Sequence, residues 1–275
     1  MHGAGNDYIY IEALDMVPEK LPLLAKEISS RHFGVGSDGL VAIMRSDHAD
    51  FRMRMFNADG SEAQMCGNAS RCIGKYVYER GLTNKTTLSL ETLAGIKELR
   101  LNVGAGEVKS VEVDMGEPTM NPEEVPVTSD NGAAVIERQI EAGGREFKVT
   151  AVGMGNPHGV IFTNELTDEI VVGCGPLLEE AAIWPEKANI EFAEVVDRNH
   201  IRMRVWERGS GETLACGTGA CACVAAAVSL GLTDRDVELS LRGGKLRVRF
   251  DEESGHIFLS GGAEFIADGV YYYYR

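Results

Sequence analysis

The chain has 275 residues, of which 44% are apolar, enough for one large domain or two of moderate size with packed cores. Its 42 acidic and 27 basic side chains give a net charge of −15, which would repel the phosphate backbone of a nucleic acid. This charge excludes a protein that binds nucleic acid through an overall positive charge. No run reaches the roughly 18 consecutive apolar residues of a membrane-spanning helix, and residues 1–15 lack the basic start and apolar core of a signal peptide. We therefore expect a globular cytoplasmic protein that binds neither nucleic acid nor membrane.

Elements of the first half are predicted from their periodicity. Alternating apolar and polar residues at 51–56 favour a half-buried strand, and a turn-rich segment follows at 57–60. A helix is expected over residues 70–80, and Gly81 is placed to end it. Further strands are predicted over 87–90, 98–103 and 108–114.

The second half repeats this plan. A strand is predicted over 201–206, a turn over 209–211 and a helix over 220–230 that ends at Gly231. That helix is apolar on every side, which is typical of a helix buried in the middle of its domain. The strands expected after it cover 238–241, 245–250 and 256–259.

A gapless internal duplication underlies the two halves. Residues 50–66 match residues 200–216, so that Cys66 pairs with Cys216 at an offset of 216 − 66 = 150. The same offset pairs Arg52 with Arg202, Arg54 with Arg204, Glu62 with Glu212, Gly67 with Gly217, Gly3 to Asn6 with Gly153 to Asn156, and Gly81 to Thr83 with Gly231 to Thr233. The duplication predicts two copies of one fold related by a pseudo-twofold axis, with a site between them made of two similar halves.

The domain boundary is expected at Pro118 to Pro126, where prolines interrupt the strand pattern. This predicts an N-terminal domain of residues 1–117 plus about 264–275, and a C-terminal domain of residues 118–263. The terminal run Tyr271 to Tyr274 receives no role.

The six cysteines are expected to be reduced thiols, because a cytosolic chain of this length does not need disulfides. Cys66 and Cys216 each lie on a turn that enters a helix, where unpaired amides favour negative charge and a lowered thiol pKa. Gly67 and Gly217 follow them and leave the helix-start amides open to a carboxylate. The other four, Cys72, Cys174, Cys221 and Cys223, fit core packing better.

Two such turns predict proton transfer at an α-carbon without a cofactor. One thiolate would remove the α-proton and the opposite thiol would supply a proton to the other face. The helix-start amides would stabilise the enediolate, which is the hard step without an electron sink.

The motifs Cys66-Gly67-Asn68-Ala69-Ser70-Arg71 and Glu212-Thr213-Leu214-Ala215-Cys216-Gly217-Thr218-Gly219-Ala220 resemble the two signatures of the diaminopimelate epimerase family. Residues 1–7, 56–61 and 155–158 are also similar to that family, in order and over nearly the full length. The resemblance implies an α/β (α+β) fold of two pseudo-symmetric domains, each a curled, mainly antiparallel sheet around a central helix. It also implies a homodimer that interconverts LL- and meso-diaminopimelate for lysine and peptidoglycan precursor synthesis.

Roles carried over from the resemblance are as follows. Cys66 and Cys216 would be the acid/base pair, with His158 and Glu207 in support. Gly67, Asn68, Gly217 and Thr218 would bind the reacting carboxylate. The far end of the substrate and its amino groups would contact Asn6, Asn57, Asn156, Asn189, Glu207 and Arg208. No metal is implied. Some relatives have Gln at the position of Gly39, so no role is assigned there, and relatives commonly carry several residues ahead of the motif that begins at Met1.

Three other readings remain open from the residues. A racemase for proline or a basic amino acid could use the same scaffold, although proline racemases usually have His where this chain has Asn68. A binding protein could retain the fold without catalysis, and its affinity for the ligand could then survive replacement of either candidate cysteine. A thiol-redox or zinc protein is the third reading, but the spacings of Cys66, Cys72, Cys216 and Cys221 are not those of structural zinc modules.

Overall fold

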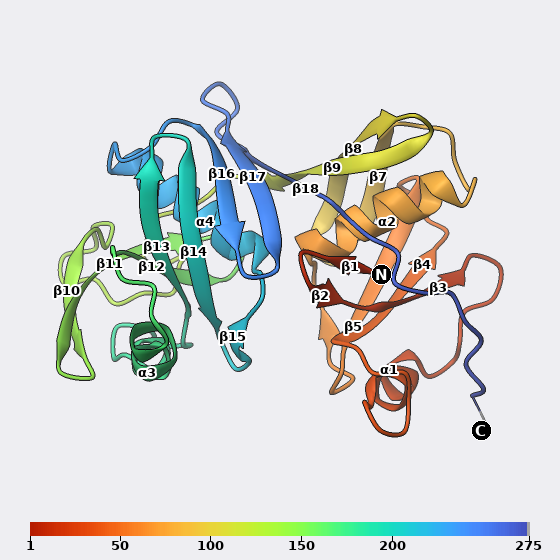
Figure 1. Ribbon diagram of the computed structural model, residues 1–275, viewed down its shortest axis with the longest axis horizontal. Coiled ribbons are helices and arrows are strands. Elements are labelled where there is room, and N and C mark those ends of the chain that lie inside the picture. The colour runs from red at the N-terminus through yellow and green to blue at the C-terminus, as the bar shows by residue number, and fades with distance from the viewer. Residues whose placement is uncertain (274–275) are drawn as a thin grey trace. The chain divides into compact units, whose positions relative to one another are not determined.

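The computed structural model describes residues 1–273, so Tyr274 and Arg275, the end of the tyrosine run and of the predicted 264–275 segment, lie outside them. The chain divides into two compact units (Figure 1). Met1–Asp114 and the segment from Ser260 onward form unit 1, and Met115–Leu259 form unit 2. Within the described part, no helix has the length and apolar character to cross a membrane.

Unit 1 is a sheet with two helices and a small separate hairpin. The sheet has the order β9-β8-β7-β5-β4-β3, with β6 on β5, and is antiparallel except for β3 with β4 and β5 with β7. Its elements are β1 (His2–Gly3), β2 (Asn6–Asp7), β3 (Ile9–Ala13), α1 (Leu21–Ser29), β4 (Gly39–Met44), β5 (Phe51–Asn57), β6 (Glu62–Ala63), α2 (Gly67–Glu79), β7 (Thr87–Thr92), β8 (Gly95–Gly104) and β9 (Glu107–Gly116).

Unit 2 has the same plan with one extra hairpin. Its strands follow the order β10-β11-β12-β13-β14-β16-β17-β18, with β15 on β14, and only β12 with β13 and β14 with β16 are recorded as parallel. Its elements are β10 (Arg138–Ala142), β11 (Arg145–Gly153), β12 (Pro157–Phe162), α3 (Asp168–Glu179), β13 (Asn189–Asp197), β14 (His200–Glu207), β15 (Gly211–Thr213), α4 (Gly217–Ser229), β16 (Asp236–Leu241), β17 (Gly244–Phe250) and β18 (Ile257–Gly261).

Strand register confirms the predicted duplication. Ile9 pairs with Leu40 between β3 and β4, and Gly159 pairs with Ile190 between β12 and β13, each 150 positions later. The next strand pair keeps the offset, with Leu40 opposite Phe56 and Ile190 opposite Trp206. Beyond α2 and α4 the offset changes by one residue, since Phe51 pairs with Leu90 in unit 1 and Ile201 pairs with Leu239 in unit 2. The fold is therefore two copies of one mainly antiparallel α/β unit, as the sequence predicts.

The central helices begin three residues earlier than predicted. Cys66 and Cys216 have extended backbones (φ −142° and −118°) and occupy the N-cap positions of α2 and α4, so both helices start at the following glycine. Glycine in the first turn hid these starts, because its helix propensity is low. Both helices end as predicted, at Gly81 (φ 71°) and Gly231 (φ 70°).

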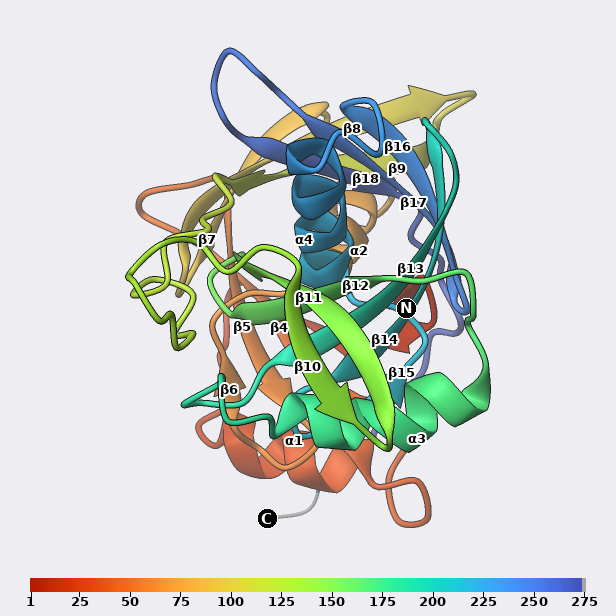
Figure 2. The ribbon, with the colours of Figure 1, turned by 90° about the vertical axis from the view of Figure 1, so that its left-hand side faces the viewer.

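Helix α4 lies in the middle of unit 2, as its all-round apolar character predicts. Residues 219–227 of this helix are fully or almost fully buried. Figure 1 shows α4 behind β14 and β16, and Figure 2 shows it from the side, with β10 and β11 nearest the viewer and α3 below. Helix α3, which the sequence analysis did not predict, packs against β13, β14 and β15.

Part of the unexplained tyrosine run belongs to the core of unit 1. Tyr271 and Tyr273 pack against the apolar cluster that α1 forms with β4, which includes Leu24, Leu40 and Phe56. The segment from Ser260 therefore returns to unit 1, where the backbone of Glu264 also bonds with that of His2.

Steric crowding explains why position 39 holds a glycine. A methyl group there would lie 2.0 Å from the carbonyl oxygen of Phe56 and 2.6 Å from the Tyr8 ring. Backbone and ring cannot both move away, so only glycine fits next to Tyr8. In unit 2 the corresponding residue is Asn189, and the smaller ring of His158 replaces that of Tyr8.

An ion pair repeats in both units with different burial. Arg204 Nε lies 2.7 Å from Glu212 Oε1 with side chains 12% and 11% exposed, while the matching pair of Arg54 and Glu62 has side chains 31% and 28% exposed. We expect Glu212→Gln to lower the free energy of unfolding by about 1–3 kcal/mol, because it removes charge-assisted bonds from a buried guanidinium. The matched control Glu62→Gln should cost less than about 1 kcal/mol. Urea unfolding measures both, and equal losses would contradict the burial argument.

Candidate active site

Side chains on three strands of unit 2 point to the start of α4. Successive residues of a strand face opposite ways, and Ile190 and Trp206 face the α3 side, where Ile190 belongs to the apolar cluster and Trp206 lies against Gly175. The residues next to them in sequence must therefore face the other way. These residues are Asn189 and Glu191 on β13 and Glu207 on β14, and His158 on β12 lies opposite Asn189 in the register.

Cys216 is buried at the first turn of α4. Its Sγ accepts the backbone N–H of Gly219 at 3.3 Å and lies 3.4 Å from Thr218 Oγ1. The first amides of a helix have no acceptor within that helix, so the backbone N–H groups of Gly217 and Thr218 remain available to a carboxylate.

The predicted low pKa is wrong for Cys216 in this conformation. Burial raises the pKa of the Cys216 thiol well above its ordinary value, and the carboxylates of Glu207 and Glu191 raise it further. The bonds from Thr218 and Gly219 lower it, but they are the smaller effects. The helix start was the only influence visible in the sequence, while burial depends on residues far along the chain. Cys216 is thus a protonated thiol, suited to donate a proton.

Glu207 lies beside this thiol. The Thr213 hydroxyl donates a hydrogen bond to Glu207 Oε1. Burial raises the pKa of the Glu207 carboxyl, Glu191 adds to the rise, and Thr213, His158 and Cys216 oppose it. A carboxyl with a raised pKa next to a thiol can exchange protons with it near neutral pH.

His158 is completely buried and bonded at both ring nitrogens. Nδ1 lies 2.7 Å from Glu191 Oε1, and Nε2 lies 2.9 Å from Asn156 Oδ1. The sequence placed Asn156 and His158 in the site but did not identify Glu191. The imidazole therefore connects a predicted substrate ligand to a buried carboxylate.

Asn189 and Arg208 form a second contact in unit 2. The backbone N–H of Arg208 donates to Asn189 Oδ1 at 3.0 Å, and Asn189 Nδ2 donates to the carbonyl of Pro157 at 2.9 Å. The Arg208 guanidinium donates to the carbonyl of Glu186 at 3.1 Å. These bonds fix the backbone and the guanidinium of Arg208, which follows Glu207 in the chain, so that adjacent residues offer a cation and a carboxyl.

In unit 1, Cys66 stands at the start of α2 within a set of amides. Its thiol donates to Asn6 Oδ1 at 3.6 Å, and Asn68 Nδ2 donates to the same oxygen at 3.4 Å. Asn6 is held from its other side by Asp38 Oδ2 at 2.8 Å, and Arg71, which is fully buried, holds Asn68 Oδ1 at 2.7 Å. The sequence predicted Asn6, Asn68 and Cys66 but not the two charged residues that fix them.

The surroundings of the two cysteines correspond in position and differ in chemistry. Asn57 occupies the position of Glu207, since 207 − 57 = 150, and its Oδ1 lies 3.5 Å from the Tyr8 hydroxyl at the position of His158. Glu191 corresponds to the buried, apolar Val41. Unit 1 thus surrounds its cysteine with neutral amides, whereas unit 2 surrounds its cysteine with two carboxyls and an imidazole.

The structure gathers the predicted residues into two groups. Asn6, Cys66, Gly67 and Asn68 belong to the group of unit 1, and Asn156, His158, Asn189, Glu207, Arg208, Cys216, Gly217 and Thr218 to that of unit 2, while Asn57 of unit 1 contacts Tyr8 and Ser61. Glu191 was missed although a signal existed. It is an acidic residue between the apolar Ile190 and Phe192, and such a residue in a buried strand requires a partner.

The remaining cysteines are buried, as predicted, and form no disulfide within residues 1–273. Cys72, Cys174, Cys221 and Cys223 are at most 4% exposed. Burial raises the pKa of the Cys223 thiol, with Glu191 adding to the rise. Among residues 1–273, no group of three or more His, Cys, Asp and Glu side chains is arranged to hold a metal ion.

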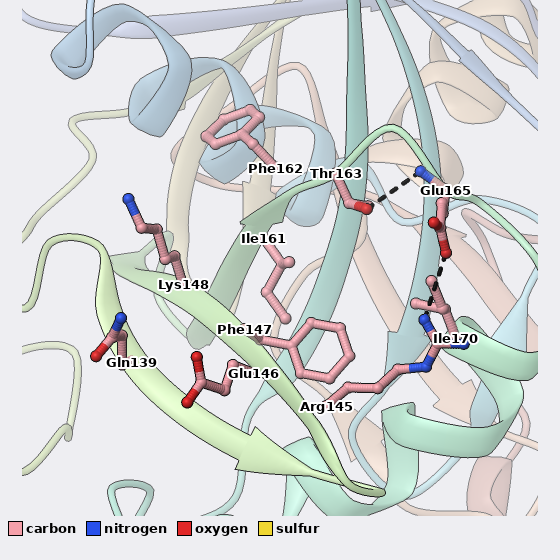
Figure 3. Close-up of a pocket in the computed structure, with 10 residues that line it drawn as sticks. All are labelled: Gln139, Arg145, Glu146, Phe147, Lys148, Ile161, Phe162, Thr163, Glu165 and Ile170. Carbon is pink, nitrogen blue, oxygen red and sulfur yellow. Dashed lines mark hydrogen bonds and ion pairs between the residues drawn. The ribbon is translucent and has the colours of Figure 1, made fainter.

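A hollow of about 400 Å³ in unit 2 lies apart from these groups (Figure 3). None of the residues that line it is a predicted site residue; its lining includes Arg145, Lys148 and Phe162. Its cations are already engaged, Arg145 with Glu165 and Glu169 and Lys148 with Glu137. The hollow is therefore not the candidate site.

Comparison with known proteins matches the chain nearly end to end. The family model described as diaminopimelate epimerase covers residues 1–121 and 150–266. A diaminopimelate epimerase of Acetivibrio thermocellus is 51% identical over 98% of this chain and 96% of its own length. One of Desulfovibrio desulfuricans is 50% identical over 99% of this chain and 96% of its own.

Solved structures of more distant proteins share the fold. A hydroxyproline epimerase from Agrobacterium vitis superposes with a TM-score of 0.67 at 17% identity, covering 94% of this chain and 86% of its own. A phenazine biosynthesis protein of the PhzF family from Bacillus anthracis gives 0.65 at 19% identity, covering 95% and 91%. At these identities the likeness concerns the fold alone.

Proposed function

This chain belongs to the diaminopimelate epimerase family, and from that premise we propose that it interconverts LL- and meso-diaminopimelate by proton transfer through Cys66 and Cys216, without a cofactor. The observation that carries the proposal is the cysteine at the N-cap of both central helices, in equivalent positions of a duplicated fold. The reaction is a step in lysine and peptidoglycan precursor synthesis.

Epimerisation requires two acid/base groups that reach one α-carbon from opposite faces. In one direction the Cys66 thiol first releases to solvent the proton that it donates to Asn6, and the resulting thiolate takes the α-proton and becomes a thiol again. The Cys216 thiol then gives its proton to the other face and becomes a thiolate. The raised pKa of Cys216 supports this starting state, since that sulfur holds its proton. In the reverse direction the roles exchange, and Glu207 is placed to accept the proton that Cys216 must first lose.

The carbanion needs stabilisation that a thiol alone cannot supply. The backbone N–H groups of Gly67 and Asn68 at one helix start, and of Gly217 and Thr218 at the other, are proposed to bind the reacting carboxylate. Charge that develops on its oxygens would then meet fixed donors and two helix dipoles. Because these donors belong to the backbone, they need no reorganisation during the reaction.

The far end of the substrate carries an amino group and a second carboxylate. Arg208 offers a cation, Glu207 offers a carboxyl, and Asn6, Asn57, Asn156 and Asn189 offer amides of both polarities. The bond from the Arg208 amide to Asn189 supports this assignment, since it orients a side chain that would contact the substrate.

Proton NMR of LL-diaminopimelate with the reduced protein in D₂O tests the proposal, without added pyridoxal phosphate or metal. Loss of the α-proton signal and appearance of the meso form are expected. L-Proline, L-histidine and L-lysine serve as controls. Exchange in one of these alone would move the substrate assignment, and exchange in none of the four would favour a binding or redox role.

We further propose that the protein is a cytoplasmic homodimer. Large apolar side chains exposed in unit 1 are available for contacts with a second copy, among them Phe33 at 93%, Val270 at 81% and Tyr272 at 72%. Sedimentation at increasing protein concentration is expected to give twice the chain mass. A monomer at micromolar concentration would contradict the dimer.

A further inference from the structure

Glu191 is a charged residue in the core of unit 2 that the proposed mechanism does not use. It is 0% exposed, and its Oε2 atom has no hydrogen-bond partner within residues 1–273. Burying a carboxylate costs free energy unless it is paired and bonded. The duplicate position in unit 1 holds Val41, which shows that this place in the fold accepts an apolar side chain. Glu191 is therefore not needed to build the unit.

Two contacts connect Glu191 to the candidate site. Its Oε1 lies 2.7 Å from Nδ1 of His158, and both side chains are fully buried. The same oxygen would be 2.5 Å from a methyl group placed on Gly219, so the carboxylate rests against the first turn of α4. The Gly219 amide in turn donates to Cys216 Sγ. One carboxylate thus touches both the imidazole and the turn that carries the thiol.

We propose that Glu191 is a positioning residue of the Cys216 half-site, which orients His158 through Nδ1 and packs beneath the turn that holds Cys216. The inference rests on the proposed epimerase function. A carboxylate at Nδ1 keeps a proton on that nitrogen and fixes the ring. Nε2 is then directed to Asn156, a proposed substrate ligand. A Cβ atom at position 219 would push the carboxylate out of this arrangement, so the glycine leaves room for it.

The charge of Glu191 adds an effect that position alone does not have. The groups that act on the Cys216 thiol are Glu207, Glu191, the Thr218 hydroxyl and the Gly219 amide, and both carboxylates raise its pKa. Glu191 also acts on His158, Cys223 and Glu207. Removing the charge should therefore lower the pKa of Cys216, so that the thiol loses its proton at a lower pH.

Glu191→Gln and Glu191→Val separate the two effects. The amide oxygen of Gln still accepts from Nδ1 but carries no charge, so we expect about a 10-fold loss of kcat. Valine, the residue of the other copy, removes the acceptor as well, and we expect about a 100-fold loss, the scale of a misplaced catalytic group. KM should change by less than about 2-fold in the Gln variant, and the alkaline limb of its kcat profile should move to lower pH.

Glu79→Gln is the matched control. Glu79 accepts bonds from the Val108 amide and Lys75 at the end of α2 opposite to Cys66. The Glu79→Gln variant should have a lower Tm and an unchanged kcat, whereas Glu191→Gln should lower kcat. A folded Glu191→Gln with the kcat and pH profile of the unaltered protein would overturn the inference. So would the control's pattern, a lower Tm with unchanged kcat.

A readout without substrate separates this inference from the proposed function. Histidine-selective ¹⁵N NMR, with the His158 signals assigned from their loss in His158→Asn, reports which ring nitrogen carries a proton. We expect a hydrogen-bonded Nδ1 proton in the unaltered protein and its loss or displacement in Glu191→Val. The same His158 spectrum in both proteins would overturn the positioning role even if diaminopimelate were not the substrate. Inactivity of the unaltered protein with the expected spectra would overturn the function alone.

Discussion

Replacing Cys66 or Cys216 by alanine is expected to lower the rate of epimerisation at least about 10³-fold, because each removes the only acid/base group proposed for one face of the α-carbon. Binding should persist, since the helix-start amides and the Arg208 region are unchanged. The conversion of LL- to meso-diaminopimelate measures the first effect, and calorimetric titration of the substrate measures the second.

Cys221→Ala is the matched control for these variants. Cys221 is one turn further along α4 than Cys216 and is also buried. It should leave kcat within about 2-fold of the unaltered protein, while the folded fraction tests for packing defects. If Cys66→Ala or Cys216→Ala retained full activity, the two-thiol mechanism would be wrong, whatever the substrate.

The Glu207→Gln variant is expected to lose about 100-fold in kcat and to be more stable than the unaltered protein at neutral pH. The activity falls because the amide cannot accept the proton that Cys216 must release. Stability rises because burial raises the pKa of Glu207. A carboxyl with a raised pKa contributes stability that is present in acid and is lost as the pH rises through the folded-state pKa.

Thermal unfolding of Glu207→Gln at several pH values checks the sign. The Tm difference between the variant and the unaltered protein should be small near pH 4, where both side chains are neutral, and should favour the variant increasingly toward pH 7. Glu212→Gln provides the contrast from the same hairpin, because the pKa of Glu212 is lowered by Arg204 and Arg242. Its Tm should fall at pH 7 and its kcat should not change. A lower Tm for Glu207→Gln at pH 7 would contradict the burial argument.

Sequence patterns predicted the central part of each unit well and the outer parts poorly. The strand, turn and cysteine-led helix were visible because their periodicity is local and occurs twice. Helices α1 and α3 were missed. The first has no side-chain cap at Lys20 and begins with Leu21-Pro22, while the second contains Pro176 near its end. Neither ends at a glycine like those that marked the ends of α2 and α4, and the start signal of α3, Thr167 followed by Asp168 and Glu169, was overlooked.

The site residues divide in the same way. Cys66, Cys216 and their following glycines could be located because the helix start and the chemistry lie in one short segment. Asp38, Arg71 and Glu191 could not, since their roles depend on partners such as Asn6, Asn68 and His158 that come from other strands.

By itself, the sequence determined the duplicated plan, the two cysteines at equivalent positions and the family, because the motifs and the constant offset between them are written in residue order. The tertiary structure alone decided how the two halves differ. Burial and neighbouring carboxylates hold Cys216 as a thiol, whereas neutral amides surround Cys66. The energy of a charge depends on the groups that folding brings around it, and these come from separate strands.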